Sequence, residues 1–366
     1  MKVLILSSRA SSLMQFRTDL ILDLVACGHE VIAAAPEKEQ DWADKIAALG
    51  SRYSSFYLER TGLNPISDLR GLRSIYKLIK KEKPDIVFTY QAKTVVYGCT
   101  AAWLCGVPSI NALLAGLGSA FRNKDRKLLK VILSLQYKFA LGCCQNVFFQ
   151  NRDDLGEFLK AGLVCENKVT MINGSGVNLQ NFTPQPLPNE NAFLFVGRLI
   201  RDKGIMEYME AARKVRIKYP TAKVRILGSF DTNPTAISPS DLEPFIKEGS
   251  IEYLGKTEDV RPYLKKCSVF VLPSYHEGTP KSVLEAMATK RPIITTDAPG
   301  CRETVIDGIN GFLVPVGDVD ALAEKMIWMI EHRAEAERMA SVSLEICREK
   351  FDVKKVNAVL LKVMGL

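Results

Sequence analysis

The chain has 366 residues, of which 47% are hydrophobic and 25% charged, a composition typical of a folded globular protein and unlike that of a disordered chain. This length suffices for two domains with well-buried cores. The net charge of +8 lies mostly in residues 1–186, where 23 Lys and Arg stand against 16 Asp and Glu, and this excess favours an anionic partner.

Nine cysteines are scattered along the chain, without a C-x-x-C pair or a Cys/His cluster that has metal-ligand spacing. We therefore expect free thiols in a reducing cytosol and no metal site. Met1 and Lys2 precede only four apolar residues, too few for a signal peptide, so we expect a cytoplasmic location.

The first half of the chain alternates apolar strands with helices. A strand is predicted at 2–6, a helix at about 13–26, and then strands from residue 29 and near 53–58, 85–90, 109–114 and 146–150. This order predicts a parallel, doubly wound sheet. The loop after the first strand lacks G-x-G-x-x-G, which weakens the interpretation as an ordinary NAD-binding domain.

Residues 94–121 contain no charged side chain, and their length would allow a membrane crossing. Gly106 and Pro108 interrupt them, so we predict a buried helix at about 94–105, a strand at 109–114 and a loop containing Gly116 and Gly118. A transmembrane helix is the minor alternative. The glycine pair fits a tight turn and the close approach of a phosphate equally well.

Two predicted helices in this half, at about 69–83 and 122–140, are basic and amphipathic. Their cations are Arg70, Arg73, Lys77, Lys80, Lys81, Arg122, Lys124, Arg126, Lys127 and Lys130. Such a face is often only solvated, but two of them in one half suit an anionic membrane surface. Nucleic acid is disfavoured because no recognition fold or aromatic stacking module accompanies them.

A proline-rich polar stretch at 183–191 is typical of a linker. After it a second α/β series begins, with strands predicted near 192–197, 223–228, 251–255, 269–274, 292–297 and 311–315. The sequence thus predicts a first domain at 1–183 and a second at 184–350 that face each other across a cleft. A C-terminal helix at about 351–366 can pack back on the first domain.

The second domain opens with a buried strand that delivers Gly197, Arg198 and Lys203 into its exit turn. Two cations beside a helix N-terminus can hold a diphosphate and neutralise the charge of a departing nucleotide. For either cation alone, a basic surface loop would be the better explanation.

A later apolar strand, at 269–272, runs into a glycine-containing turn that opens a helix, with Thr279 as expected N-cap and Pro280 as first helical residue. The helix N-terminus suits phosphate, while Glu277 and Glu285 suit the hydroxyls of a sugar or ribose. This combination indicates a nucleotide-sugar. Alternatively, Glu285 forms a surface pair with Lys281 that contributes about 0.2–0.5 kcal/mol.

The spacing of Glu277 and Glu285 resembles the E-x7-E signature of retaining glycosyltransferases of the GT4 type, and residues 197–204 resemble their G-R-x4-K-G motif. The resemblance covers nearly the whole chain and implies the GT-B fold, with two Rossmann-like parallel-sheet domains and the donor bound mainly by the second. It implies that Arg198 and Lys203 bind the donor diphosphate, that Glu277 contacts the transferred sugar and that Glu285 contacts the ribose. Gly278, Thr279 and Pro280 would complete the donor site.

The resemblance also implies front-face substitution, in which the donor's own phosphate oxygen takes the acceptor proton. Arg198, Lys203 and Glu277 would then be the catalytic residues, and no enzymic base, cofactor or metal would be required. Asp318-x-Asp320 is formally a D-x-D sequence, but an apolar helix follows it and it indicates a helix cap.

The loop at 114–119 lacks the histidine that many GT4 members carry there. It resembles the E-G-L-G-S loop of bacterial transferases that extend polyprenyl-diphosphate-linked oligosaccharides, with Ala115 at the acidic position, and Arg17 and Lys93 also match that subgroup. The resemblance therefore implies that the acceptor binds at Arg17, Lys93, Gly116 and Gly118. The expected donor is a UDP-sugar carrying a hexose or N-acetylhexosamine, and the expected acceptor is a lipid-diphosphate-linked saccharide. Together with the basic helices, this predicts a peripheral protein on the inner face of the cytoplasmic membrane.

Two other functions fit the same architecture. A GT-B-fold UDP-sugar epimerase shares the ligand class, but it needs acid and base residues that we cannot place. A non-catalytic scaffold of a polysaccharide assembly complex would keep the fold without turnover, and the intact Arg198, Lys203, Glu277 and Glu285 disfavour it.

Overall fold

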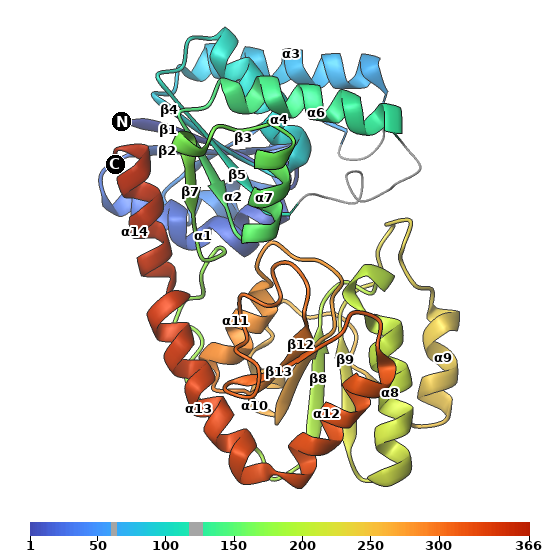
Figure 1. Cartoon of the computed structure of the whole chain (residues 1–366). Helices are drawn as coiled ribbons and strands as arrows, with labels where there is room; N and C mark the ends of the chain where they lie inside the picture. The colour runs from blue at the N-terminus through green and yellow to red at the C-terminus, as the bar shows by residue number, and fades with distance from the viewer. Residues whose placement is uncertain (60–63, 117–126) are drawn as a thin grey trace. The chain divides into compact units, whose positions relative to one another are not determined.

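The computed structural model describes residues 1–59, 64–116 and 127–366, and for residues 127–129 it describes the backbone alone (Figure 1). The chain divides into two compact units, one formed by Met1–Ser175 with Val356–Leu366 and the other by Gly176–Lys355. The chain passes from one to the other after Ser175 and returns after Lys355.

The first unit is built on a parallel sheet with strand order β3-β2-β1-β4-β5-β6-β7 among the described residues. Its strands are β1 (Lys2–Leu6), β2 (Glu30–Ala35), β3 (Arg52–Ser55), β4 (Ile86–Tyr90), β5 (Ser109–Leu114), β6 (Asn146–Phe149) and β7 (Val169–Met171). Its helices are α1 (Ala10–Ala26), α2 (Glu39–Ala47), α3 (Pro65–Glu82), α4 (Ala92–Leu104), α6 (Lys127–Gly142), α7 (Arg152–Lys160) and most of α14 (Val353–Met364), with a short 3-10 turn, η1 (Glu166–Lys168).

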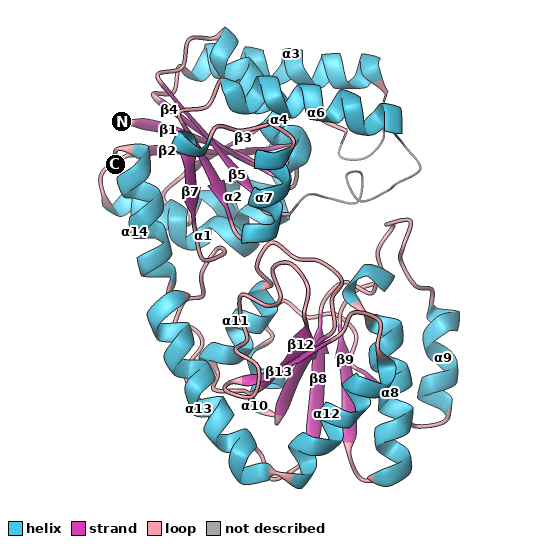
Figure 2. Ribbon diagram, viewed as in Figure 1, coloured by secondary structure: helices cyan, strands magenta, loops and turns pink. Residues whose placement is uncertain are grey.

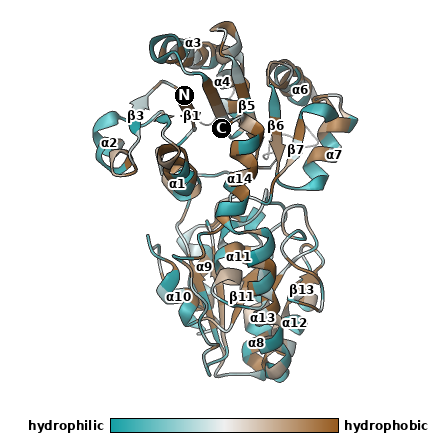
Figure 3. Cartoon of the chain, turned by 90° about the vertical axis from the view of Figure 1, so that its left-hand side faces the viewer, coloured by the Kyte–Doolittle hydropathy of each residue, from teal (hydrophilic) through white to brown (hydrophobic). Residues whose placement is uncertain are grey.

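Successive residues of each strand in this unit point to opposite faces of the sheet, and helices cover both faces (Figure 2). Leu4 and Leu6 belong to the core that α3, α4, α6 and α7 share, whereas Val3 and Ile5 belong to the core under α1, α2 and α14. The central strands β1 and β4 are therefore mostly apolar, whereas the edge strand β3 carries Arg52 and two serines. The helices carry apolar residues on one side (Figure 3). Asn357 of α14 donates a hydrogen bond to Asp23 Oδ2 of α1 at 2.7 Å, which ties the end of the chain to this unit.

The second unit repeats the plan with strand order β10-β9-β8-β11-β12-β13. Its strands are β8 (Ala192–Val196), β9 (Lys223–Leu227), β10 (Glu252–Tyr253), β11 (Val269–Leu272), β12 (Ile293–Thr296) and β13 (Gly311–Val314). Its helices are α8 (Ile205–Lys218), α9 (Pro239–Lys247), α10 (Arg261–Lys265), α11 (Lys281–Ala288), α12 (Val319–Glu331) and α13 (Arg333–Lys350), with a 3-10 turn, η2 (Arg201–Lys203). The predicted pair of parallel sheets is confirmed.

Each sheet reverses its strand order at one place. In the first unit the chain builds outward from β1 through β2 to β3, and then from β4 through β5 to β7, so the order reverses between β1 and β4. In the second unit it reverses between β8 and β11. Loops that leave the carboxyl ends of two such strands diverge, and the crevice between them is where open α/β sheets bind ligands.

The structure bears on three expectations. The unit boundary lies after Ser175 rather than after residue 183, because Val177 pairs with Asp352 and packs into the core of the second unit. The predicted helix at 122–140 is described only from Lys127, and residues 122–126 lie outside the described residues. Within the described ranges, no helix is long and apolar enough to cross a membrane.

Candidate active site at the strand-order reversal of the second unit

The loop after β8 carries the first pair of predicted site residues. Arg198 follows Gly197 directly, and Lys203 ends the 3-10 turn η2 before Gly204 starts α8. Gly204 has φ 69°, and a Cβ there would lie 1.9 Å from the carbonyl oxygen of Pro273. Glycine is therefore required for the turn that carries Lys203 to pack against the chain leaving β11.

The loop after β11 brings Glu277 to Lys203. The two side chains form an ion pair, in which Lys203 is 18% exposed and Glu277 is 13% exposed. Ser274 Oγ donates to Glu277 Oε1 at 2.8 Å, and the backbone N–H of Tyr275 donates to Asp202 O at 2.9 Å. The two loops are thus joined through backbone and side chains, and one carboxylate and one cation are held together at the carboxyl end of adjacent strands.

Arg198 is held from the other side by the loop after β9. Its Nη1 lies 3.2 Å from Asp231 Oδ2, and Asp231 also accepts the backbone N–H of Asn233. Asp231 is 7% exposed, whereas Arg198 is 45% exposed. The guanidinium is therefore fixed at its buried edge and remains open to solvent at the other, as a ligand-binding cation requires.

Glu285 lies in α11, the helix that follows the turn carrying Glu277. Burial raises the pKa of its carboxyl to about 7, and the charge of Lys281 opposes that rise without cancelling it. Within the described residues the carboxylate accepts no hydrogen bond and forms no ion pair. A surface pair with Lys281 is therefore a poor explanation for this residue, because such a pair would lower the pKa of an exposed glutamate.

The raised pKa of Glu285 predicts a pH-dependent stability. The folded state binds this proton more tightly than the unfolded chain, whose pKa is near 4.5, so the free energy of unfolding should fall as the pH rises from about 4.5 to about 7. Glu285→Gln should remove the loss and stabilise the protein at pH 8 by up to about 3 kcal/mol, with little change at pH 4.5. Urea unfolding of the variant and the native chain at pH 4.5 and at pH 8 measures this difference in the free energy of unfolding.

A surface glutamate supplies the matched control. Glu243 pairs with Lys247 at 2.6 Å across one turn of α9 and is 57% exposed, so Glu243→Gln should not stabilise the protein at pH 8.

UDP titration by calorimetry adds a second readout: Glu285→Gln should weaken UDP binding, while Glu277→Ala should retain it. If Glu285→Gln were destabilising at pH 8, burial would not be the dominant influence on this carboxyl.

The turn at 278–280 leads from Glu277 into α11. The expected cap at Thr279 is wrong by one residue: α11 starts at Lys281, and Pro280, with an extended ψ of 108°, is its N-cap without a side-chain cap bond. Gly300 packs under this turn, where a Cβ would lie 2.2 Å from Glu277 O and 2.5 Å from Gly278 O. Sequence reasoning missed Gly300 and Ser274 as supports, and the only signal for Gly300 is its place in a Pro-Gly turn after β12.

The other predicted residues lie in the first unit. Arg17 lies on α1 and is 2% exposed, and Lys93 on α4 forms a 2.7 Å ion pair with Asp68 of α3. Gly116 follows β5 with φ 106°, and Gly118 lies outside the described residues.

The potential metal sequence Asp318-x-Asp320 is a helix start. Asp318 is the N-cap of α12 and accepts the backbone N–H of Ala321 at 2.9 Å, as predicted. Asp320 pairs with Lys214 of α8. In the parts of the chain that the structure describes, no group of three or more His, Cys, Asp and Glu residues could hold a metal ion.

Two parallel-sheet units, with cations and carboxylates gathered where the strand order reverses, define the GT-B class of nucleotide-sugar enzymes. Residues 190–332 match the family model described as glycosyl transferases group 1, and residues 2–151 match that described as glycosyl transferase 4-like. The chain therefore belongs to the GT4-type glycosyltransferases, in agreement with the similarity to individual relatives given below.

Two curated relatives are similar over most of their length. The chain is 29% identical over 347 residues to the N,N'-diacetylbacillosaminyl-diphospho-undecaprenol alpha-1,3-N-acetylgalactosaminyltransferase of Campylobacter jejuni, with 90% of each chain covered. It is 30% identical over 299 residues to the UDP-Gal:alpha-D-GlcNAc-diphosphoundecaprenol alpha-1,3-galactosyltransferase of Escherichia coli, with 78% of this chain and 75% of the relative covered.

Solved structures share the fold at low identity. Anabaena Alr3699/HepE in complex with UDP aligns with a TM-score of 0.78 at 16% identity, with 100% of both chains covered. Sucrose-phosphate synthase from Thermosynechococcus elongatus aligns with a TM-score of 0.81 at 18% identity, with 99% of this chain and 98% of that chain covered. Family membership makes the protein a glycosyltransferase and disfavours the epimerase alternative.

Proposed function

We propose that the protein transfers a hexose or N-acetylhexosamine from a UDP-sugar to a saccharide linked through a diphosphate to a polyprenol. The observation that carries this proposal is the Lys203–Glu277 ion pair at the strand-order reversal of the second unit, with Arg198 held by Asp231 in the same group of loops and the half-buried Glu285 in the helix that follows Glu277. The donor chemistry is supported by the solved relative that binds UDP, and the acceptor chemistry by the two relatives named for diphosphoundecaprenol substrates.

The charges of the site suit each part of a UDP-sugar. Arg198 and Lys203 would bind the diphosphate and stabilise the negative charge that UDP acquires on leaving, so that no metal or cofactor is needed for this step. Glu277 would accept hydrogen bonds from hydroxyls of the transferred sugar. Lys203 would then exchange its contact with Glu277 for one with the donor phosphate. Glu285 would accept from the ribose.

The reaction that fits these groups is a front-face substitution with retention. The acceptor oxygen bonds to the anomeric carbon on the face that UDP leaves, the bond from that carbon to the phosphate oxygen breaks, and the departing oxygen takes the acceptor proton. The protein then has only to position the donor and the acceptor and to neutralise the charge of the departing UDP. Alpha products, as in the names of both curated relatives, follow from alpha-linked donors by this route.

A transfer assay distinguishes this proposal from its two alternatives. We expect transfer when UDP-hexoses and UDP-N-acetylhexosamines are offered with a short-chain prenyl-diphosphate-linked saccharide, and NMR of the product should show an alpha linkage. An altered sugar nucleotide without acceptor would mean epimerisation. UDP binding without turnover on the panel would favour the scaffold, and a beta linkage would contradict retention.

We further propose that the first unit docks on the inner face of the cytoplasmic membrane, where such an acceptor lies. An exposed apolar stripe crosses α4 and α6, formed by Trp103, Leu104, Val131, Ile132, Leu135 and Phe139. Trp103 and Phe139 join the two helices edge to face, with ring centroids 5.5 Å apart. Exposed Lys130 and Lys138 on α6 accompany the stripe, as in helices that lie in a membrane interface.

Liposome sedimentation tests this docking. The protein should bind vesicles that contain anionic lipid, and the double change Leu135→Ser with Phe139→Ser should abolish most of the binding, because about 0.8 kcal/mol is lost for each CH2 group no longer buried. Ile217→Ser is the matched control, since Ile217 is 83% exposed on α8 of the second unit. Unchanged binding of the double variant, or absence of binding by the native chain, would contradict docking through this stripe.

A further inference from the structure

Tyr275 connects the two loops that carry Lys203 and Glu277. It lies in the loop after β11, two residues before Glu277, and its backbone N–H donates to Asp202 O at 2.9 Å. Its phenol reaches the other side of the Lys203 turn, where Tyr275 Oη donates to Glu207 Oε1 of α8 at 2.8 Å. Tyr275 thus contacts the chain directly before Lys203 and again one helical turn after it. We refer to these two hydrogen bonds as the Tyr275 tether.

The carboxylate of Glu207 accepts one hydrogen bond among the described residues, the one from Tyr275. Its second oxygen, Oε2, is buried and has no hydrogen-bond partner in that part of the chain. A buried carboxylate oxygen without a partner lowers the stability of a fold, and native proteins keep few such atoms. Stability therefore does not explain a glutamate at this position, and its one hydrogen bond indicates a functional role.

The phenol of Tyr275 is placed to remain a hydrogen-bond donor. The residue is 38% exposed, yet partial burial raises the pKa of the phenol to about 12, and the hydrogen bond to Glu207 and the charges of Glu207 and Asp202 add to the rise. The phenol is therefore protonated at neutral pH. Gly317, in the loop between β13 and α12, lies beside it, since a Cβ there would be 3.5 Å from Tyr275 Oη. A third loop thus packs against the hydroxyl that donates to Glu207.

Two kinds of side-chain contact hold these loops together in the free protein. One is the ion pair of Lys203 with Glu277, and the other is the Tyr275 tether. Ser274 adds less than its distances suggest. Its Oγ lies 2.8 Å from Glu277 Oε1 and 3.1 Å from Asp202 O, but a hydroxyl has one proton and can donate to only one of these oxygens at a time.

Donor binding changes the balance between these contacts. In the proposed reaction Lys203 exchanges its contact with Glu277 for one with the donor phosphate, so the ion pair between the loops is lost while the donor is bound. The Tyr275 tether uses neither of these side chains and remains intact. In the donor complex the loop that carries Glu277 is therefore connected to the Lys203 turn through Tyr275 and the single proton of Ser274.

We propose that Tyr275 and Glu207 are positioning residues that hold Glu277 at the transferred sugar while Lys203 is bound to the donor phosphate. This rests on the proposed function, because the exchange at Lys203 comes from there. Tyr275 acts through the loop that carries Glu277, and Glu207 acts through Tyr275. A displacement of about 1 Å at a group that positions the substrate can lower a rate about a hundredfold, so a single hydrogen bond at this place affects turnover.

Transfer kinetics test this role. Tyr275→Phe and Glu207→Ala should each lower kcat about tenfold to a hundredfold and change KM for the donor by less than about threefold, because the groups that bind UDP are unchanged. Glu207→Gln keeps an acceptor for the phenol and should retain kcat within about threefold of the native value. The double variant should lose no more than Tyr275→Phe alone, since both changes remove one hydrogen bond. Losses that multiply, equal losses in Glu207→Gln and Glu207→Ala, or an unchanged kcat would overturn the assignment.

Tyr219 offers a control with the same chemistry. It follows the last residue of α8, and its Oη donates to Glu331 Oε1 at 2.6 Å, so it forms a tyrosine–glutamate bond at the opposite end of the helix that carries Glu207. Tyr219→Phe should therefore leave kcat and the donor KM unchanged. An equal fall of kcat in Tyr219→Phe and Tyr275→Phe would mean that loss of any such bond on α8 impairs the enzyme, and the positioning role would be rejected.

Hydrogen exchange tests the Tyr275 tether without turnover. In Lys203→Ala the ion pair is absent, so adding Tyr275→Phe should speed amide exchange in residues 274–279 at least about threefold without any ligand. In a chain that keeps Lys203, Tyr275→Phe should speed this exchange only when UDP is added. Unchanged exchange in both backgrounds would overturn the tether, whether or not the native chain transfers a sugar. Faster exchange in the variants, with no transfer by the native chain to any acceptor, would retain the tether and reject the proposed function.

Discussion

Replacement of Lys203 or Arg198 by alanine should reduce kcat by two to three powers of ten. Each change removes one of the two cations placed to stabilise the charge that develops on the departing diphosphate, and single stabilisers of this kind contribute about 2.7–4 kcal/mol to catalysis. Lys203→Ala also leaves the largely buried Glu277 without its ion-pair partner. Transfer rates under saturating donor and acceptor measure the effect.

A lysine of the same unit provides the control. Lys214 pairs with Asp320 on the surface formed by α8 and α12 and is 45% exposed, so Lys214→Ala should leave kcat unchanged. Melting temperatures would verify that all variants fold. Near-normal turnover in both Lys203→Ala and Arg198→Ala would remove the leaving-group site from the proposal.

Replacement of Arg291 by methionine should lower the free energy of unfolding by about 3–5 kcal/mol. Arg291 precedes β12 and is fully buried, and its partners among the described residues are carbonyl oxygens, those of Leu264, Lys265, Gln185, Pro186 and Lys290 at 2.9–3.3 Å. Methionine fills much of the volume but removes the guanidinium donor from these carbonyls, of which Leu264 O keeps the backbone N–H of Cys267 at 3.2 Å. The loss is about 1–3 kcal/mol for each carbonyl that is left without a donor and that water cannot reach. Urea unfolding followed by circular dichroism measures the loss.

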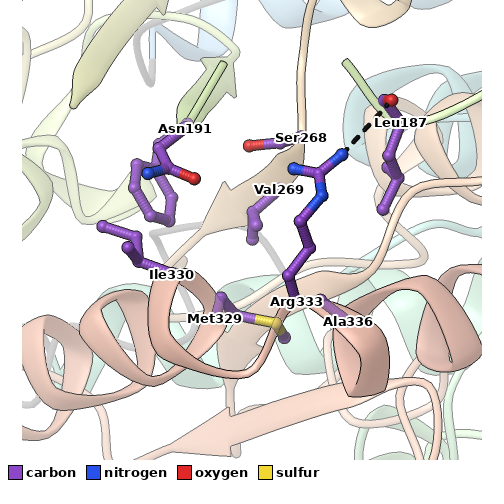
Figure 4. Close-up of a pocket in the computed structure, with 9 residues that line it drawn as sticks. Leu187, Asn191, Ser268, Val269, Met329, Ile330, Arg333 and Ala336 are labelled. Atoms are coloured by element: carbon purple, nitrogen blue, oxygen red, sulfur yellow. Dashed lines mark hydrogen bonds between the residues drawn. The ribbon is translucent and has the colours of Figure 1, made fainter. Parts of the chain in front are cut away.

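Arg333 is the matched control for Arg291. It also donates to the linker, to Leu187 O and Pro188 O, but its side chain is 37% exposed and pairs with Glu337. Arg333 lines a small cavity of about 10 Å3 at the amino end of β8 and β11, and its guanidinium lies beside Leu187 (Figure 4). Arg333→Met should change stability by less than about 1 kcal/mol. Comparable losses in both variants would contradict the role assigned to Arg291.

Short-range patterns in the sequence were enough for the elements and for the donor motifs. Apolar runs of four to six residues predicted the strands, because strands buried on both faces of a parallel sheet have no polar side. The motif around Arg198 and Lys203 and the pair Glu277 and Glu285 were recognisable because each lies within one strand–turn–helix segment. Helix boundaries were less certain: the start of α11 differed by one residue, since the choice between Thr279 and Pro280 depends on a single ψ angle.

Contacts between distant segments were decided only by the tertiary structure. The pairing of Lys203 with Glu277 and the contact of Asp231 with Arg198 depend on strand order, which brings residues 74 and 33 positions apart to one sheet edge. The same holds for the unit boundary, which follows the pairing of Val177 with Asp352 and not the proline-rich composition near residue 183. Tyr275 shows the difference most clearly: its place two residues before Glu277 is visible in the sequence, but its bond to Glu207 of α8 depends on β8 and β11 being neighbours in the sheet.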